Sequence, residues 1–234
     1  MNPLSELADQ HGSDKGVRVG NPPHRYTFLY DLIFHELRAR PIALAEIGLA
    51  IGGPELGGPV DRKVASPSVA MWQAYFPEAH IYGFDISDFS HLATPRFTFV
   101  RGDSGSEADL RRFADIRDGF DVIIDDASHA SYHQQLAFRV LFPRLRPGGL
   151  YIIEDLNWQS PAYEGVLPSV PRTADLLYNF MINDIYIENR LLSRADLAAI
   201  RARLESFAVF PDFSTEARGG IKLAVMRAAP GDGA

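Results

Sequence analysis

Seven acidic residues share one kind of position in this sequence, at or near the ends of short apolar runs. The runs IALAEIG, HIYGFD, FTFVRGD, FDVIIDD and LYIIEDL each carry one or two of these acids. In an open parallel sheet, ligands bind outside the carboxyl ends of the strands, so the acids predict a ligand site along one sheet edge. They are Glu46, Asp85, Asp103, Asp125, Asp126, Glu154 and Asp155.

The acids of the last two runs could hold a divalent metal ion. Carboxylates that are crowded together repel one another unless a cation offsets their charge. Asp126, Glu154 and Asp155 offer oxygen ligands, which suit a hard cation such as Mg²⁺ that also accepts water and substrate oxygens. Zn²⁺ fits less well because the chain has no cysteine. In the alternative interpretation, the acids cap helices and pair with nearby arginines. Those arginines are Arg139, Arg144 and Arg146.

His129 is the strongest candidate for a general base. It follows Asp126 by three residues in DASH, so both side chains can face one cavity if a helix begins there. An imidazole titrates near neutral pH, which suits proton transfer. In the alternative interpretation it is a structural histidine, and His133 and His24 are weaker candidates for the base. The sequence has no G-x-S-x-G motif, so Ser-His-Asp hydrolysis finds no support.

The first acidic run leads into a glycine-rich turn that allows close approach of a ligand. EIGLAIGG has a glycine at Gly48, but Ala50 stands where the dinucleotide fingerprint needs its second glycine. No G-x-x-x-x-G-K-[ST] phosphate loop is present either. Asp85, at the end of the next run, is suited to accept hydrogen bonds from two ribose hydroxyls. In the alternative interpretation, the glycines only make turns and Asp85 caps a helix.

Alternating strands and helices must position these residues. Apolar residues at helical spacing predict a helix over 26–37. Five strands are expected, at 42–48, 80–85, 97–103, 120–126 and 150–156. Helices are expected between them, at 67–76, 105–116 and 131–145. This alternation, in units of about 30 residues, is typical of right-handed βαβ connections and a mostly parallel sheet.

The rhythm changes after residue 156. Helical patterns cover 173–189 and the residues after Ser193, where Ser193 and Asp196 predict a capping box. Two strand-like runs follow, at 206–212 and 221–227. The expected fold is therefore α/β: a doubly wound, mostly parallel seven-stranded sheet with antiparallel pairing at its C-terminal end and an N-terminal helical segment.

Composition limits the classes of protein to consider. Of 234 residues, 46% are hydrophobic and 23% are charged, which is ordinary for a packed globular domain and excludes a disordered or fibrous chain. The net charge of −7 argues against a nucleic-acid partner. No apolar run approaches the roughly 20 residues of a membrane span, and no secretory signal is evident. We therefore expect a cytoplasmic protein that acts on a small molecule and binds neither nucleic acid nor membrane.

Four of these motifs together resemble those of class I S-adenosylmethionine-dependent methyltransferases. They are EIG, YFPEAHIYGFDIS, IIDDASH and LRPGGLYIIEDL. More narrowly, they are similar to the metal-dependent sugar O-methyltransferases of macrolide biosynthesis and to the related cephalosporin-pathway methyltransferase, and the leader HGSDKG is similar to that of the same group. The resemblance covers residues 10–156. One departure is the segment GPELGGPVDRKVASP, which delays the helix that normally follows the first glycines and indicates an extra lid or subunit contact over 54–66.

The resemblance implies a role for each matching residue. Mg²⁺ would be held by Asp126, Glu154 and Asp155, and His129 would be the general base. The S-adenosylmethionine site would contain Glu46, Gly48, Asp85, Asp103 and Asp125, together with Lys15, His24 and Tyr26 from an N-terminal segment that closes over it. Within that set, Glu46 and Gly48 would border the methionine part, Asp85 would hold the ribose, and Asp103 would lie beside the adenine.

These implications predict a single methyltransferase domain over 1–234. Its expected parts are an N-terminal helical lid over 1–40, a cofactor-binding core over 42–156, an acceptor-side insertion over 157–190, and a C-terminal helix and strand pair over 191–234. The expected function is Mg²⁺-dependent O-methylation of a hydroxyl on a sugar or another small natural product, as in antibiotic biosynthesis. Trp158, Tyr163 and the apolar stretch around Phe180 could form the acceptor wall or could simply be core packing.

Two alternatives stay open. One is a metal-independent methyltransferase in which the acids only orient the substrate. The other is a module that binds S-adenosylmethionine without catalysing transfer. The sequence does not decide whether the chain forms a homo-oligomer.

Overall fold

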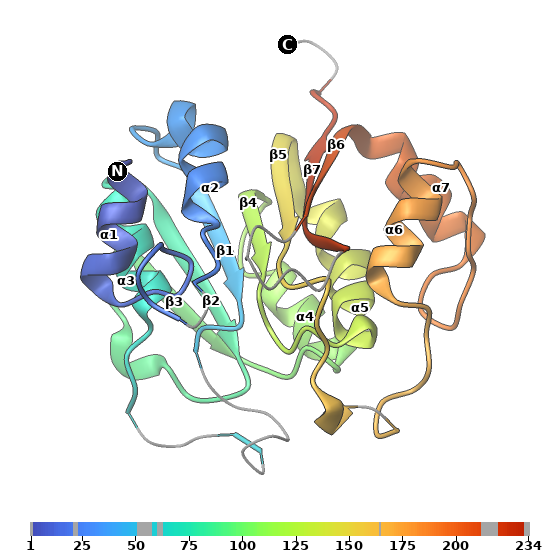
Figure 1. Cartoon of the computed structure of the whole chain (residues 1–234), viewed down its shortest axis with the longest axis horizontal. Coiled ribbons are helices and arrows are strands. Elements are labelled where there is room, and N and C mark those ends of the chain that lie inside the picture. The colour runs from blue at the N-terminus through green and yellow to red at the C-terminus, as the bar shows by residue number, and fades with distance from the viewer. Residues whose placement is uncertain are drawn as a thin grey trace.

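The computed structural model describes residues 2–20, 23–50, 58–59, 63–163, 165–211 and 220–231. Its centre is a seven-stranded sheet with the order β3-β2-β1-β4-β5-β7-β6 (Figure 1). The strands are β1 (Ala43–Ile47), β2 (His80–Asp85), β3 (Phe97–Arg101), β4 (Phe120–Asp125), β5 (Leu145–Ile153), β6 (Leu204–Pro211) and β7 (Ile221–Ala228). The first five are parallel, whereas β7 runs antiparallel to both β5 and β6. The expected fold class is confirmed.

Helices cover both faces of this sheet (Figure 1). The α-helices are α1 (Pro3–His11), α2 (Thr27–Phe34), α3 (Pro67–Tyr75), α4 (Glu107–Ala114), α5 (Ser131–Leu141), α6 (Thr173–Met181) and α7 (Arg194–Arg203). Short 3₁₀ helices occupy His35–Leu37, Ser90–Leu92, Phe142–Arg144 and Pro161–Tyr163. None of the helices in the described part of the chain combines the length and apolar character needed to cross a bilayer.

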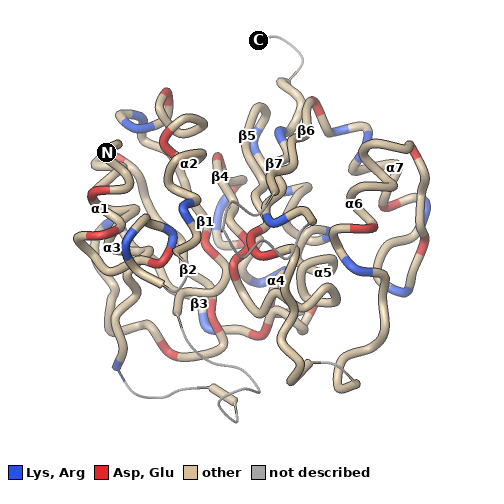
Figure 2. Tube along the Cα trace, in the orientation of Figure 1, with Lys and Arg blue, Asp and Glu red and all other residues tan. Residues whose placement is uncertain are grey.

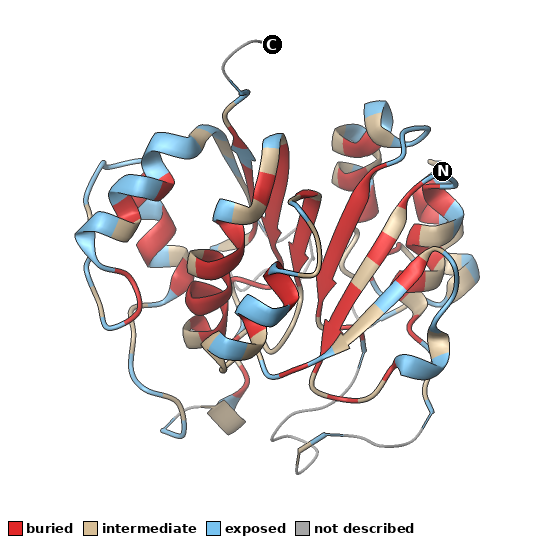
Figure 3. Cartoon of the chain, turned by 180° about the vertical axis from the view of Figure 1, so that it is seen from behind, coloured by how far each residue is buried: buried red, intermediate tan, exposed pale blue. Residues whose placement is uncertain are grey.

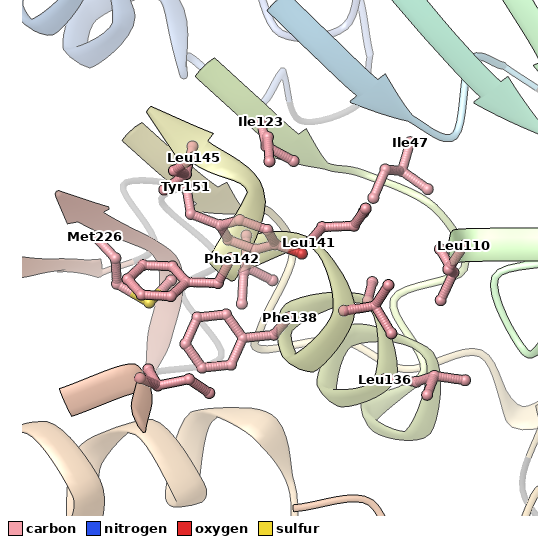
Figure 4. Close-up of a cluster of buried hydrophobic side chains, with 14 of the residues drawn as sticks. Ile47, Leu110, Ile123, Leu136, Phe138, Leu141, Phe142, Leu145, Tyr151 and Met226 are labelled. Atoms are coloured by element: carbon pink, nitrogen blue, oxygen red, sulfur yellow. The ribbon is translucent and has the colours of Figure 1, made fainter. Parts of the chain in front are cut away.

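Two apolar cores hold the helices against the sheet. On one face, side chains from α1, α2 and α3 pack around Trp72, which is fully buried. On the other face, α4, α5, α6 and α7 pack on β4, β5 and β7. Phe138, Phe142 and Tyr151 form part of this second core, with ring centroids 5.2–6.2 Å apart (Figure 4). Burial is concentrated in the central strands and on the helix surfaces that face them (Figure 3).

Strand register places the acidic ends of the strands side by side. Ile47 of β1 lies opposite both Phe84 of β2 and Asp125 of β4, and Asp125 lies opposite Ile153 of β5. Glu46, Asp126 and Glu154 therefore reach the same edge of the sheet, as the pattern of apolar runs predicts.

Three elements differ from the expectations. The N-terminal segment, expected to be helical over 1–40, contains a second helix at Pro3–His11 besides the one predicted over 26–37, and Asn2 caps it by accepting a hydrogen bond from the Ser5 amide at 2.7 Å. The helix expected over 173–189 ends at Met181, and Asp184 shortly beyond it takes a left-handed φ of 56°. The strand expected over 150–156 instead begins at Leu145, as β5, and contains a register shift against β4.

Serine side chains cap two of the helices, and one of these caps is the capping box predicted at Ser193. Ser66 accepts a hydrogen bond from the Val69 amide, with Pro67 at the first position of α3. Ser193 and Asp196 form a capping box at the start of α7. Most of the predicted lid or subunit contact over 54–66, namely residues 54–57 and 60–62, lies outside the described residues.

Candidate metal and cofactor site

The centre of the site is a buried lysine that meets carboxylates from three strand ends. Lys15 Nζ donates a hydrogen bond to Glu154 Oε2 at 2.7 Å, pairs with Asp126 Oδ2, and lies 3.8 Å from Glu46 Oε1. The lysine side chain is 2% exposed. Burial opposes its charge, but the three carboxylates outweigh burial and raise the pKa of Lys15 well above its ordinary value. The ammonium group therefore stays charged. Figure 2 shows acidic and basic positions meeting in this middle part of the molecule.

Both carboxylate oxygens of Glu154 accept a hydrogen bond. Its Oε2 accepts from Lys15, and its Oε1 accepts from the Tyr30 hydroxyl at 2.5 Å. Burial and the nearby charge of Asp126 raise the pKa of Glu154, although Lys15 and Tyr30 oppose that shift. The local negative charge is therefore only partly offset by the protein's own groups.

Asp155 is held by the N-terminal segment and by the last strand. Its Oδ1 accepts a hydrogen bond from the Tyr26 hydroxyl at 2.9 Å and lies 3.4 Å from His24 Nδ1 and 3.7 Å from Lys222 Nζ. Burial opposes ionisation, but the hydrogen bond and charge of His24 hold the pKa of Asp155 well below its ordinary value. Asp155 therefore stays a carboxylate at neutral pH.

Three potential metal ligands converge beside this cluster. One ligand atom each from Asp126, His129 and Asp155 lies within 4.8 Å of the other two. His129 takes a left-handed φ of 58°, and its Nδ1 is buried without a hydrogen-bond partner among the described residues. Its ring meets the edge of Trp158 at a centroid distance of 5.5 Å. Two carboxylates that converge on an imidazole fit a divalent cation or a proton in transfer.

Gly48 allows the ends of β1 and β4 to meet. A Cβ at this position would lie 2.2 Å from the Asp126 carbonyl oxygen, and the backbone φ is +84°. The Asp126 amide donates a hydrogen bond to the Ile47 carbonyl at 2.9 Å. Glycine is therefore required to place Asp126 at the site.

Glu46 and Asp85 are both held by internal donors. Glu46 accepts hydrogen bonds from Ser68 Oγ at 2.8 Å and from Trp72 Nε1 at 3.1 Å, and burial raises its pKa to about 7. Asp85 accepts from the Leu49 and Ser87 amides, each at 2.7 Å. Burial raises the pKa of Asp85, but the backbone amides of Ala50 and Ile86 also oppose that shift, so backbone donors fix the position of this carboxylate.

Asp103 and Asp125 lie away from the lysine cluster. Asp103 Oδ1 accepts a hydrogen bond from the Gly105 amide at 2.7 Å, close to the buried ring of His133. The Oδ2 of Asp125 is buried without a partner among the described residues, and burial raises the pKa of Asp125 to about 7. Its charge acts on the buried hydroxyl of Tyr151.

The arginines offered as alternative partners of the acids bind elsewhere. Arg139 pairs with Glu107 and Arg144 with Asp115. Arg146 lies 3.2 Å from Asp121. The acids at the strand ends therefore do not pair with these arginines, and that part of the alternative is wrong.

Comparisons with known proteins identify the family. No protein-family model matches the chain. Over 175 residues, or 73% of this chain, it is 41% identical to the 8-demethyl-8-alpha-L-rhamnosyl tetracenomycin-C 2'-O-methyltransferase of Streptomyces olivaceus. It is 40% identical to the mycinamicin VI 2''-O-methyltransferase of Micromonospora griseorubida over 156 residues, or 65% of this chain. The solved structure of MycE methyltransferase from the mycinamycin biosynthetic pathway, in complex with Mg and SAH, aligns with 99% of this chain at a TM-score of 0.73 and 28% identity. The chain belongs to the class I S-adenosylmethionine-dependent methyltransferase family.

The chain spans less than half the length of the two relatives, 42% and 36%, and 56% of the MycE chain. The resemblance stated on four sequence motifs is thus confirmed for the family. The roles of individual site residues stay predictions.

Two side chains of the site, those of Tyr30 and Lys222, were not predicted from the sequence. Tyr30, the hydroxyl donor to Glu154, fits the apolar face expected over 26–37 and carries no sign of a polar role. It follows Tyr26 by four residues, and both hydroxyls point to the same acidic pair, so the i, i+4 spacing of the tyrosines was the available signal. Lys222, near Asp155, belongs to a strand distant in sequence and gives no local signal.

Proposed function

We propose that this methyltransferase transfers the methyl group of S-adenosylmethionine to a hydroxyl on a sugar moiety of a small natural product, with Mg²⁺ bound at Asp126, Glu154 and Asp155. The observation that carries the proposal is the convergence of ligand atoms from Asp126, His129 and Asp155 within 4.8 Å. Relatives named as O-methyltransferases of rhamnosyl tetracenomycin and mycinamicin VI support the acceptor class. Neighbouring structures that contain Mg and SAH support the cofactors.

The donor set fits a divalent cation. Asp155 is kept ionised, and Asp126 reaches the same space from the neighbouring strand end. Each Glu154 oxygen accepts one hydrogen bond, from Lys15 or from Tyr30, so one lone pair on each oxygen would remain for a metal ion. When bound, the cation supplies Lewis acidity, which lowers the pKa of an acceptor hydroxyl.

His129 accepts the acceptor's proton in this proposal. Its buried Nδ1 has no competing hydrogen bond among the described residues, so a lone pair is available to a hydroxyl that enters the site. The Ala130 amide donates to Ser128 Oγ at 3.3 Å, and the edge of Trp158 lies against the imidazole, so backbone and ring are both positioned. When bound, S-adenosylmethionine would supply the methyl group to the acceptor oxygen, and S-adenosylhomocysteine would be the second product.

The cofactor lies along the ends of β1, β2 and β3 in this proposal. Asp85 holds the ribose hydroxyls, Gly48 lets the backbone approach, and Asp103 borders the adenine. Glu46 and Asp125 also belong to this cofactor site, and the N-terminal segment contributes Lys15, His24 and Tyr26 to it. Bringing donor and acceptor into contact removes much of the entropic cost of a bimolecular reaction, up to about 7–11 kcal/mol.

Trp158 is the best-placed residue for the acceptor side. Its side chain is 38% exposed while its ring edge contacts His129. Phe180, in contrast, is fully buried and packs against Tyr186 at 5.4 Å, so it belongs to the core and not to an acceptor wall.

One observation favours the metal-independent alternative. Lys15 already supplies a positive charge to the three carboxylates around it, so the acids can coexist without a metal ion. Removal of metal separates the two functions.

The test combines binding with turnover. Titration calorimetry should show S-adenosylhomocysteine binding, and turnover on rhamnosyl-bearing polyketides should stop in EDTA and return with added Mg²⁺. Turnover that survives EDTA would contradict the metal proposal but not methyl transfer. Failure to bind the cofactor would contradict both and leave neither alternative standing.

A further inference from the structure

Lys15 occupies a position that the proposed reaction leaves unexplained. Its ammonium group contacts Asp126 and Glu154, two of the three proposed Mg²⁺ ligands, and is nearly excluded from solvent. A buried lysine normally exists only with a compensating anion, and here it has three. A cation and a metal ion with shared partners must influence each other.

Acidic side chains outnumber basic ones around Lys15. Among the residues that the structure describes, no other cation lies within 4.0 Å of Glu46, Asp126 or Glu154. Lys222 serves Asp155 instead, at 3.7 Å. One ammonium group therefore stands against three carboxylates, in a region where burial weakens solvent screening.

The loop around Lys15 fixes its position independently of those acids. The Thr27 amide donates a hydrogen bond to the Lys15 carbonyl at 3.1 Å. Asp9 Oδ1 accepts from the Val17 and Arg18 amides at 3.1 and 3.0 Å, which ties the loop to α1. Lys15 is thus delivered to the site by a structured segment and is not a long side chain that happens to reach it.

We propose that Lys15 is a positioning residue that acts as the internal counter-cation of the metal-free site. Its ammonium group holds Asp126 and Glu154 together where a divalent ion would otherwise be needed, and it competes with that ion for the same oxygens. The inference rests on the metal site proposed above. It assigns this lysine to control of metal affinity, in addition to its expected place in the segment that covers the cofactor.

The competition has a definite sign. Replacement of Lys15 by methionine keeps the length of the side chain but removes the charge, which leaves the carboxylates uncompensated. The metal-free protein loses stability, because an unpaired buried charge is costly. The Mg²⁺-bound form loses less, since the ion supplies the missing charge. Mg²⁺ should therefore bind Lys15→Met about 10–100-fold more tightly than the wild type.

The experiment follows thermal unfolding and Mg²⁺ binding with S-adenosylhomocysteine present. Wild type, Lys15→Met and Arg201→Met are compared in EDTA and across a MgCl₂ titration. Arg201 is exposed on α7 and faces Asp184 at 4.0 Å, so Arg201→Met makes the same change in net charge away from the site. We expect the rise in Tm with Mg²⁺ to be largest for Lys15→Met and equal in the other two.

A double variant tests the same idea without metal. Glu154→Gln removes one of the carboxylates that Lys15 neutralises, so Lys15→Met/Glu154→Gln should be more stable in EDTA than Lys15→Met alone. A purely structural lysine would make the two losses add.

The outcomes separate this inference from the proposed function. If the wild type binds no Mg²⁺, the proposed metal site fails, and the inference fails with it. If the wild type binds Mg²⁺ but Lys15→Met binds it equally or more weakly, the inference alone is overturned. A Lys15→Met protein that stays unfolded at every Mg²⁺ concentration, or a double variant no more stable in EDTA than the single, also overturns the inference.

Discussion

Replacement of Gly48 by alanine should damage this protein more than replacement of other glycines with similar backbone angles. The residue has a φ of +84°, and an added Cβ would lie 2.2 Å from the Asp126 carbonyl oxygen and 2.5 Å from the Ala127 Cα. Both close atoms belong to the backbone, so no side-chain rotation relieves the overlap. The left-handed conformation costs alanine about 1–2 kcal/mol. Displacing the packed backbone adds about 1–3 kcal/mol.

The total loss for Gly48→Ala is therefore about 2–5 kcal/mol. For a domain of this size, each kcal/mol lowers Tm by about 2–4 °C, so we expect a fall of roughly 4–20 °C in a calorimetric scan. Gly148→Ala is the matched control, because Gly148 has a φ of +75° and open space where its Cβ would lie. It should lose only the conformational part, about 1–2 kcal/mol.

The same substitution should affect the proposed metal site. The Asp126 carbonyl must move away from residue 48, and the carboxylate of Asp126 moves with it. Mg²⁺ affinity should therefore fall in Gly48→Ala and stay unchanged in Gly148→Ala. Equal losses of stability in the two variants would refute the claim that contact between the ends of β1 and β4 requires glycine.

Three further substitutions test separate parts of the site. His129→Ala should lower kcat by about 10²–10⁴-fold with unchanged affinity for S-adenosylhomocysteine, and a loss of tenfold or less would remove it from the role of base. Asp85→Asn should weaken S-adenosylhomocysteine binding about tenfold in calorimetry while Mg²⁺ affinity is kept, whereas unchanged cofactor affinity would exclude a ribose contact. Burial lowers the pKa of His24, but its hydrogen bond with Asp155 and the charge of Asp155 outweigh burial, so the pKa is raised. The pair therefore stabilises the metal-free fold fully below pH about 6.5, and this contribution is lost as the pH rises through the raised pKa. His24→Asn should flatten this loss in Tm measurements in EDTA, and an unchanged pH profile would count against the pair.

The row of acids at the sheet edge could be predicted because each strand and its terminal acid are visible in one short stretch of sequence. Each parallel strand reads as an apolar run, and the rule that ligands bind at carboxyl ends turns the terminal acids into one row. Asp126, His129 and Asp155 do come together within 4.8 Å. The order of the strands was enough to predict that acids on separate runs lie close together, and no knowledge of side-chain packing was required.

The partners of these acids could not be predicted in the same way. Lys15 reaches Glu154 across 139 positions of sequence, and no periodicity links a loop lysine to a strand end. Glu154 and Asp155 are adjacent and chemically similar, yet one meets Lys15 and Tyr30 while the other meets His24 and Tyr26. Both residues lie just beyond β5, and Asp155 takes a left-handed φ of 52°, a local turn that the alternation of side chains along a strand does not predict.

The end of α6 shows a limit of helical patterns. Apolar residues continue past Met181, but the chain leaves the helix, and the Ile185 amide returns to the Asn179 carbonyl at 2.9 Å. Asp184 has a φ of 56°, a conformation that aspartate tolerates better than most residues. The polar pair Asn183–Asp184 was therefore a better guide to the end of the helix than the apolar residues on either side of it.

The most direct test of the central claim is anomalous diffraction from crystals grown with S-adenosylhomocysteine and Mn²⁺ in place of Mg²⁺. The proposal predicts one strong manganese peak about 2 Å from carboxylate oxygens of both Asp126 and Asp155, beside the ring of His129. S-adenosylhomocysteine bound at the ends of β1 and β2 with no manganese between these two aspartates would contradict it.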